Sequence, residues 1–298
     1  MFVGDVGWDT AVLARTALPE PDEKVLAELC ADGVGGVAAN AAVACARAGI
    51  RTTLCSTVGN DLFAPIIRDT LRSEGIAVTL DEGDGPTTRA IILLDHTGEK
   101  RLLLYPGSGM YPHHATVTAL DLSEKPWIHT ALYDLETGSH LIARCREAGS
   151  PWSIDLEPAT IPADFDRLAN ALDGCNTVFV NQRAVSVIGA GAVDRLLAAG
   201  VDHVVETLGP AGARVTSGSG STGYRPPNNA EPVRDTTGAG DALAGWYVAG
   251  RVRGLPPGDA VRQGVAAASW SVRTIGTTNS YPTERELISC MTMNGDEL

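Results

Sequence analysis

The sequence has 298 residues, enough for a large buried core, and its length predicts one α/β domain. Its formal net charge of −13 excludes a surface for nucleic acid or anionic membrane, because such surfaces need clustered Lys and Arg. No apolar run approaches membrane-spanning length, and the first residues lack the features of a signal peptide, so we expect a cytoplasmic protein without membrane segments.

The six cysteines are scattered, and none has CxxC spacing. Their mostly apolar surroundings predict reduced thiols in the core of a cytosolic protein. The six histidines show no metal-ligand spacing, so we interpret them as structural or surface residues.

From the N-terminus to about residue 105, the hydrophobic pattern predicts many short strands and few helices. We expect strands over 2–6, 12–14, 24–29, 51–58, 76–80, 87–95 and 100–105. Two helices are expected over 41–48 and 62–74, each followed by a glycine that ends it. The segment 32–40 is predicted as a flexible loop before the first helix. The last two strands would form a hairpin around His96–Glu99.

From about residue 120, strand patterns alternate with helix patterns. Strands are expected over 127–131, 152–156, 177–180 and 203–207, and helices over 140–148, 163–172 and 192–199. This alternation predicts a parallel sheet with helices on both faces. The early hairpin segments do not fit it, so we interpret about 11–30 and 87–105 as a small β lid within a single domain of residues 1–298.

The most informative stretch is RDTTGAGD, residues 234–241, which opens an apolar run of helical length. Small residues at a helix N-terminus expose unpaired N–H groups, and the helix dipole favours an anion there. Asp241 would lie in the first turn, where a carboxylate can accept a proton beside a bound phosphate. Taken alone, the pattern fits equally well an ordinary turn in which Asp241 complements the dipole.

The segment DTTGAGD resembles the C-terminal signature of the ribokinase–PfkB family of sugar and nucleoside kinases. A second segment, Gly35 to Asn40 (GGVAAN), resembles the N-terminal signature of that family, a Gly-Gly pair with Asn four residues on. Its glycines would let the backbone touch a sugar, and the amide of Asn40 suits a pair of hydroxyls. The alternative is a plain loop with Asn40 as a helix cap.

The resemblance extends from Gly4 to Pro282. It implies a ribokinase-like three-layer α/β sandwich with a mainly parallel central sheet and a small β-sheet lid. It also implies an ATP-dependent sugar kinase, with a ketose or pentose such as fructose or ribose as acceptor.

The resemblance carries roles over to matching positions. The implied catalytic residues are Asp241, as general base, and Gly238, Ala239 and Gly240, whose amides form an anion hole. The implied acceptor-binding residues are Asp9, Gly35, Gly36 and Asn40. The implied nucleotide-side residues are Asn181, Thr207, Gly209, Gly212, Thr237 and Thr277. Mg²⁺ is implied with ATP, and Asp235 and Ser280 match positions that hold a monovalent cation, K⁺, in many members.

Two departures leave the details open. The family often has Asn-x-x-Glu after a buried strand, but here Asn181 is followed by Ala184 at the Glu position. The magnesium network would then run through waters, or Arg183 would touch phosphate. Ketohexokinase-like members also lack that Glu, and the segments Ile154–Pro158 and Val178–Asn181 resemble them. Val37 stands where ribokinases have Lys and ketohexokinases have Asn, an apolar choice closer to bacterial fructokinases.

Two other functions are consistent with the same motifs. The acceptor could be a nucleoside, whose ribose offers the same hydroxyl. The chain could also be a binding or regulatory relative that has lost turnover, which the missing Glu at Ala184 suggests and an intact Asp241 opposes. The open edges of the lid strands suggest a homodimer through the lid.

One glycine pattern is set aside. Gly218–Gly223 fits G-x-G-x-x-G, but a dinucleotide fingerprint must open a helix, and Pro226 and Pro227 forbid one there. We expect the tip of a hairpin.

Overall fold

The computed structural model describes residues 1–96, 100–227 and 232–293. Its described residues form a nine-stranded central sheet in the order β13-β12-β11-β10-β9-β8-β1-β4-β5. The strands are β1 (Phe2–Val3), β4 (Thr53–Val58), β5 (Ala77–Glu82), β8 (Ile128–Ala131), β9 (Trp152–Leu156), β10 (Thr177–Asn181), β11 (Val204–Thr207), β12 (Ala213–Ser217) and β13 (Gly220–Tyr224).

The sheet is parallel from β11 through to β5, as the alternating pattern predicted. Only β12 and β13, at one edge, run antiparallel to their neighbours. They form a hairpin whose turn lies between Ser217 and Gly220, so the G-x-G-x-x-G pattern opens no helix.

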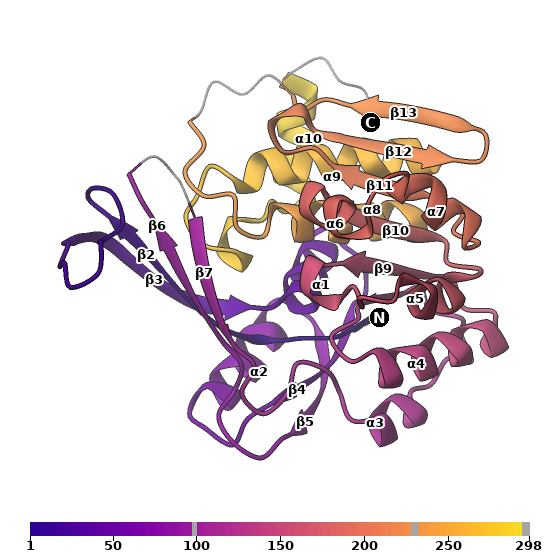
Figure 1. The fold of residues 1–298 in the computed structure, drawn as a ribbon, viewed down its shortest axis with the longest axis horizontal. Helices are drawn as coiled ribbons and strands as arrows, with labels where there is room; N and C mark the ends of the chain where they lie inside the picture. Colours follow the sequence, from indigo (N-terminus) through magenta and orange to yellow (C-terminus); the bar gives the residue numbers. More distant parts are fainter. Residues whose placement is uncertain (97–99, 228–231, 294–298) are drawn as a thin grey trace.

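Helices cover both faces of the sheet (Figure 1). One face carries α1 (Val37–Arg47), α2 (Phe63–Ser73), α8 (Ala239–Val252), α9 (Pro257–Ser271) and α10 (Glu284–Met293). The other carries α3 (His114–Ala119), α4 (Leu135–Ala148), α5 (Phe165–Leu172), α6 (Gln182–Ile188) and α7 (Ala192–Ala198). Successive residues of a strand point to opposite faces of the sheet. On β10, Phe179 packs into the core on the α8 side, whereas Val178 and Val180 pack into the core on the α4 side.

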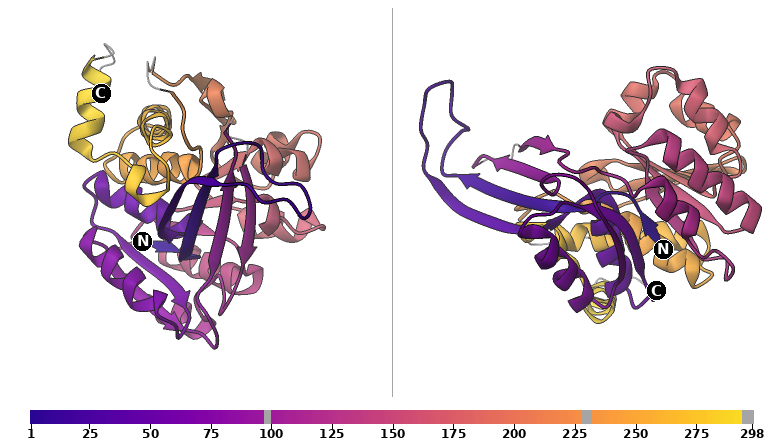
Figure 2. Two further views of the ribbon diagram at one scale, coloured as in Figure 1. Left: turned by 90° about the vertical axis from the view of Figure 1, so that its left-hand side faces the viewer. Right: turned by 90° about the horizontal axis from the view of Figure 1, so that it is seen from below.

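A second, small sheet projects from the body over the carboxyl edge of the central sheet (Figure 2). It consists of β2 (Gly7–Ala14), β3 (Ala27–Gly35), β6 (Arg89–Leu94) and β7 (Lys100–Tyr105) in the order β3-β2-β6-β7. The β2–β3 and β6–β7 pairs are antiparallel hairpins, and β2 pairs with β6 in parallel. Residues 97–99 of the expected β6–β7 turn lie outside the described residues.

The prediction was wrong about the segment 32–40. It is not a flexible loop: β3 continues to Gly35 and α1 begins at Val37, four residues before the expected start. The cause is a long-range cap. The carboxylate of Asp5 accepts hydrogen bonds from the amides of Val37 and Ala38, at 2.9 and 3.1 Å, which satisfies the first turn of the helix.

Several other element bounds differ from the expectation. The first strand ends at Val3, and α3 and α6 were not predicted. Helix α6 is short and begins directly after β10, where Asn181 caps it by accepting a hydrogen bond from the amide of Ala184 at 2.8 Å. Its seven residues are too few for a clear helical period.

Four of the cysteines, Cys45, Cys55, Cys145 and Cys175, are free and buried, as expected. Cys30 is also free but lies exposed on β3, which corrects the expectation of a core position. Within the described part of the chain, no helix combines the length and the apolar character needed to cross a membrane.

Candidate functional site

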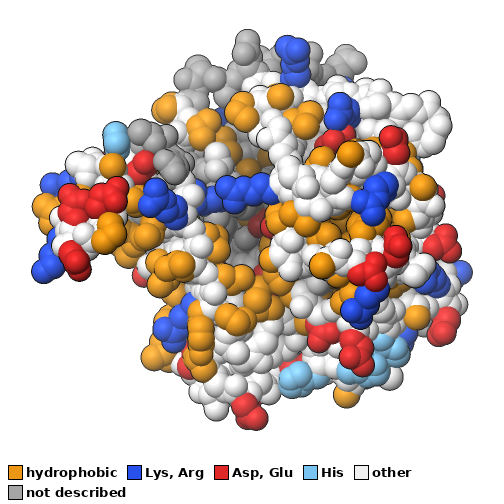
Figure 3. Space-filling view, viewed as in Figure 1, with side chains coloured by type: hydrophobic (Ala, Val, Ile, Leu, Met, Phe, Trp, Pro, Cys, Tyr) orange, Lys and Arg blue, Asp and Glu red, His pale blue; other side chains and the backbone are white. Residues whose placement is uncertain are grey.

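The site lies at the carboxyl edge of the central sheet, where the loops after β1 and β9 meet the first turns of α1 and α8. In open α/β sheets, ligands bind in the crevice at this edge. Figure 3 shows the molecule hollowed between the small sheet and the main body.

Asn40 and Asp241 meet across 201 residues of sequence. The side-chain Nδ2 of Asn40 donates a hydrogen bond to Oδ2 of Asp241 at 2.7 Å. Asn40 is only 4% exposed, and its Oδ1 has no hydrogen-bond partner. Asp241 lies in the first turn of α8, as the motif predicted. One candidate substrate-binding residue therefore touches the candidate base and retains an unused hydrogen-bond acceptor.

The turn that opens α8 has the geometry of an anion-binding site. Gly238 is the N-cap with φ of 73°, and a side chain there would overlap the hydroxyl of Tyr281. That hydroxyl donates to the carbonyl of Gly238 at 3.1 Å and fixes the turn. Ala239 is the first helical residue. A Cβ at Gly240 would meet nothing within 4 Å, so this face of the helix N-terminus is open to a ligand.

Asp9, Gly35 and Gly36 lie together at the base of the small sheet. The carboxyl group of Asp9, on β2, lies where a side chain on Gly35 would be. Gly36 has φ of 102°, and a Cβ there would approach the carbonyl oxygen of Asp5 to 2.8 Å. Both glycines are therefore required by close backbone approach, and they leave the Asp9 carboxyl beside the first turn of α1.

Asp235 joins the α8 turn to the loop that follows α9. Its two carboxylate oxygens accept hydrogen bonds from the amides of Thr237, at 2.8 Å, and Gly276, at 3.0 Å. In the same loop the hydroxyl of Thr277 donates to the carbonyl of Val34 at 3.1 Å.

The hydroxyl of Ser280 donates to the carbonyl of Thr277 at 2.7 Å. Asp235 and Ser280 are thus both brought to the loop over 276–280. These groups offer oxygen ligands, the type that suits a hard cation, so Asp235 and Ser280 are the residues that would hold K⁺ here if it binds.

The candidate nucleotide-side residues lie on neighbouring strand ends. Asn181 and Thr207 are register partners at the ends of β10 and β11. Gly209 opens the short 3₁₀ helix Gly209–Ala211, with open space beside its Cα, and Gly212 closes it. The carbonyl of Gly212 accepts from the amide of Leu208 at 2.8 Å. These residues surround one loop but lie three to four strands along the edge from β1.

A group of carboxyl side chains surrounds Asp241, and three of them, Asp5, Asp155 and Glu157, were not among the predicted site residues. Burial raises the pKa of Asp241 to about 8; the hydrogen bond from Asn40 opposes this shift, and the charges of Glu157 and Asp5 add to it.

Burial also raises the pKa of Asp5 to about 6 and, with help from Asp5 and Asp235, that of Asp9 to about 7. The pKa values of Asp155 and Glu157 are raised by burial and by their acidic neighbours. Asp155 is the last but one residue of β9, and Glu157 follows that strand directly. This position at the end of a parallel strand is a signal that could have marked them.

Lys100, at the start of β7, reaches across the hollow from the small sheet. Its Nζ lies 3.5 Å from the hydroxyl of Thr237, beside the α8 turn. Its charge lowers the pKa values of Asp9, Glu157 and Asp241, which places it among them. The sequence showed only that Lys100 is one of three lysines; the contact depends on how the small sheet folds over the body.

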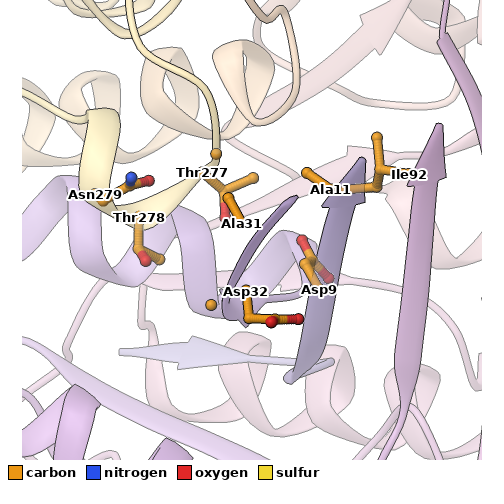
Figure 4. A pocket seen from close by; sticks show the side chains of 10 residues that line it. Asp9, Ala11, Ala31, Asp32, Ile92, Thr277, Thr278 and Asn279 are labelled. Carbon is orange, nitrogen blue, oxygen red and sulfur yellow. The ribbon is translucent and has the colours of Figure 1, made fainter. Parts of the chain in front are cut away.

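A cavity of about 100 Å³ adjoins Asp9 on the side of the small sheet. Strands β2, β3 and β6 line it together with the loop over 276–279 (Figure 4). Asp9 and Thr277, two of the predicted site residues, face the same space from opposite walls.

In the part of the chain that the structure describes, no group of three or more His, Cys, Asp or Glu side chains could hold a metal ion. The position of the expected Glu is occupied by the fully buried Ala184. A Mg²⁺ ion that keeps most of its ligands from phosphates and water is compatible with this, since Mg²⁺ uses few protein carboxylates at phosphate sites.

Comparisons with known proteins agree on one family and one fold. The pfkB family carbohydrate kinases match residues 8–284. Mouse ribokinase is 26% identical over 290 residues, covering 93% of this chain and 90% of the mouse protein. The nucleoside kinase of Methanothermobacter thermautotrophicus is 26% identical over 297 residues, covering 98% and 95%. The structure of Arabidopsis thaliana ribokinase complexed with ribose and ATP is similar, with a TM-score of 0.79, 20% identity and 96% coverage of both chains.

Proposed function

Because the chain belongs to the pfkB family of carbohydrate kinases, we propose that it transfers the γ-phosphoryl group of ATP to a primary hydroxyl of a small sugar, a ketose or pentose such as fructose or ribose. The observation that carries this proposal is the contact between Asn40 and Asp241 beside the open N-terminal turn of α8. There, a residue that could bind the sugar (Asn40), a candidate base (Asp241) and a candidate phosphate site lie next to one another.

In the proposed reaction, Asp241 accepts the proton of the sugar hydroxyl while the oxygen of that hydroxyl attacks the γ-phosphorus. The bond from that phosphorus to the bridging oxygen of ADP breaks, and ADP leaves. A base with a pKa of about 8 suits proton transfer near neutral pH. The amides of Gly238, Ala239 and Gly240 stabilise the charge on the transferring group, which is the main catalytic effect in phosphoryl transfer.

The acceptor is proposed to bind against Asp9, Gly35, Gly36 and Asn40. ATP would extend along the edge of the sheet toward Asn181, Thr207, Gly209 and Gly212, with Thr237 and Thr277 beside its phosphates. Mg²⁺ bound to ATP would neutralise the phosphate charge. K⁺ at Asp235 and Ser280 would brace the loop after α9 against the α8 turn.

The small sheet, which contains the segments of about 11–30 and 87–105, is proposed to act as a lid over the sugar. It would exclude water from the acceptor and limit hydrolysis of ATP. Its outer strand β7 exposes Leu102, Leu103 and Leu104, whose exposed fractions are 48%, 66% and 44%. An exposed apolar edge strand of this kind favours pairing with a second copy, so we propose a homodimer through the lid.

The second candidate function is a nucleoside kinase. The cavity beyond Asp9 favours it, because a substituent on the sugar could extend into that space between the small sheet and the loop over 276–279. A catalytically impaired relative is a third reading, which the intact Asn40–Asp241 pair opposes.

The test is ADP release with Mg²⁺-ATP and a panel of ketoses, aldopentoses and nucleosides. Sugar-dependent ADP release supports the proposal, and nucleoside-dependent release without activity on free sugars supports the second candidate. Absence of acceptor-dependent turnover across the panel, with ATP binding retained, favours the impaired relative.

A further inference from the structure

The part of the site proposed to bind the sugar has many groups that can accept hydrogen bonds and few that can donate them. Oδ1 of Asn40 is buried and has no partner. The side-chain carboxylates of Asp155 and Glu157 make no hydrogen bond or ion pair with any other described residue, although Asp155 is only 8% exposed. Buried polar groups in proteins are normally paired, so the unpartnered Oδ1 of Asn40 and the buried carboxylate of Asp155, with the half-buried Glu157 beside them, point to a ligand that supplies donors.

The pleat of β9 directs Asp155 toward the acceptor. Ile154 and Leu156 pack into the core on the α4 side, so residues 153 and 155 face the α8 side. Ser153 confirms this direction, because its hydroxyl accepts from the indole of Trp127, which belongs to the core on the α8 side. Asp155 ends on the same side as Asp241.

Glu157 follows two residues later and faces the same group of charges. The charge of Glu157 raises the pKa values of both Asp155 and Asp241, and the charge of Asp5 raises all three. The carboxylate of Asp5 is already used by the first turn of α1. Among described residues, Lys100 is the cation that acts on this group, and it also lies beside Thr237 at the phosphate side.

A neutral sugar leaves this imbalance in place. Its hydroxyls can donate hydrogen bonds, but each buried carboxylate keeps its charge or must take up a proton. An ammonium group supplies three donors and a positive charge, which pairs two neighbouring carboxylates directly. A carboxylate or phosphate on the acceptor would add a like charge instead.

Resting on the kinase function proposed above, we propose that the acceptor is an amino-substituted sugar or polyol whose ammonium group lies between Asp155 and Glu157. Its hydroxyls lie against Asn40 and Asp9, and the hydroxyl to be phosphorylated faces Asp241. Sugars that carry a carboxylate or a phosphate are poor ligands of the same pocket.

The test measures binding without ATP, so that it does not depend on turnover. Sugars are compared in matched sets, each neutral parent with its amino-deoxy and its carboxylate analogue, for example glucose, glucosamine and gluconate, by calorimetry at neutral pH. The variant D155N/E157Q is compared with D166N/E147Q, a control pair of exposed acids on α5 and α4. Circular dichroism checks that each variant is folded.

At least one amino sugar is expected to bind at least tenfold more tightly than its neutral parent. That preference is expected to disappear in D155N/E157Q and to persist in the control pair. Equal or weaker binding of every amino analogue, or a preference that survives in D155N/E157Q, overturns the inference. The inference is also overturned if MgCl₂ alone binds to the wild type but not to D155N/E157Q, because the two carboxylates would then hold the metal.

The two proposals fail separately. An amino sugar that binds as expected but releases no ADP with Mg²⁺-ATP overturns the kinase function while the cationic subsite stands. A neutral sugar that is phosphorylated without any preference for its amino analogue leaves the kinase function standing and overturns the subsite.

Discussion

Replacing Asp241 by Asn is expected to inactivate the protein and at the same time stabilise it. The substitution keeps the shape of the side chain, and the new amide oxygen can still accept the hydrogen bond from Asn40. It removes the proton acceptor, so kcat should fall by at least about 10²-fold, the lower end for the loss of a general base.

The gain in stability follows from the sign of the pKa shift. The pKa of Asp241 rises from 3.8 to about 8 on folding, so the folded state holds this proton more tightly than the unfolded state does. Stability is therefore lost as pH rises from about 4 to about 8. A shift of about four units at about 1.4 kcal/mol each sets an upper limit of about 6 kcal/mol on the loss, because Glu157 and Asp5 share the titration.

Thermal unfolding of both proteins at pH 5 and pH 8.5 measures this effect. D241N should unfold at a higher temperature than wild type, and the difference should be larger at pH 8.5. Asp194→Asn changes an exposed first-turn aspartate of α7; it should give no gain in unfolding temperature, only a small loss from the helix dipole, and no difference that grows between pH 5 and pH 8.5. In wild type, kcat/KM for the acceptor should rise with pH through an apparent pKa near 8. Near-normal turnover of D241N, or a stability gain that does not grow with pH, would refute this account of Asp241.

Four further predictions test the site, the lid and the β12–β13 hairpin. Lys100→Met should lower kcat at least about tenfold and move the acid limb of the pH–rate profile to higher pH, because Lys100 lowers the pKa of Asp241. The control Lys24→Met, at the exposed tip of the same sheet, should change neither kcat nor the pH–rate profile. Gly240→Ala should raise stability by up to about 1 kcal/mol in denaturant titrations but weaken turnover, because its Cβ enters open space that the phosphoryl group needs. Leu103→Asp should shift light-scattering mass from dimer toward monomer, and an unchanged dimer would exclude the lid interface. Shortening 218–223 should leave ADP release nearly intact, whereas inactivation would show that this hairpin belongs to the site.

The motifs could be predicted from sequence because they depend on local backbone chemistry. DTTGAGD predicted the start of α8 and the position of Asp241 in its first turn, and both are seen. The alternation of strands and helices after residue 120 predicted a parallel sheet, and that sheet is present. Periodicity and small-residue turns reflect neighbours within a few residues, so they survive in a single sequence.

The start of α1 and most of the acidic group could not be found in this way. Helix α1 begins at Val37 because of a carboxylate 32 residues earlier in the chain, and no local pattern encodes that contact. Asp155 and Glu157 looked like the end of an ordinary strand, and Lys100 like an exposed hairpin residue. Their importance depends on which strand ends become neighbours in the sheet, and the order β10-β9-β8-β1 is set by packing.

The sequence by itself therefore determined the family signature, the parallel α/β core and the candidate base with its anion-binding turn. Each depends on residues adjacent in the chain. Only the tertiary structure decided what surrounds Asp241: the hydrogen bond from Asn40, the charge of Lys100 and the unpaired Asp155 and Glu157. Electrostatic effects act through space at distances of a few ångströms. The raised pKa of Asp241 and the charges around it are thus properties of the fold.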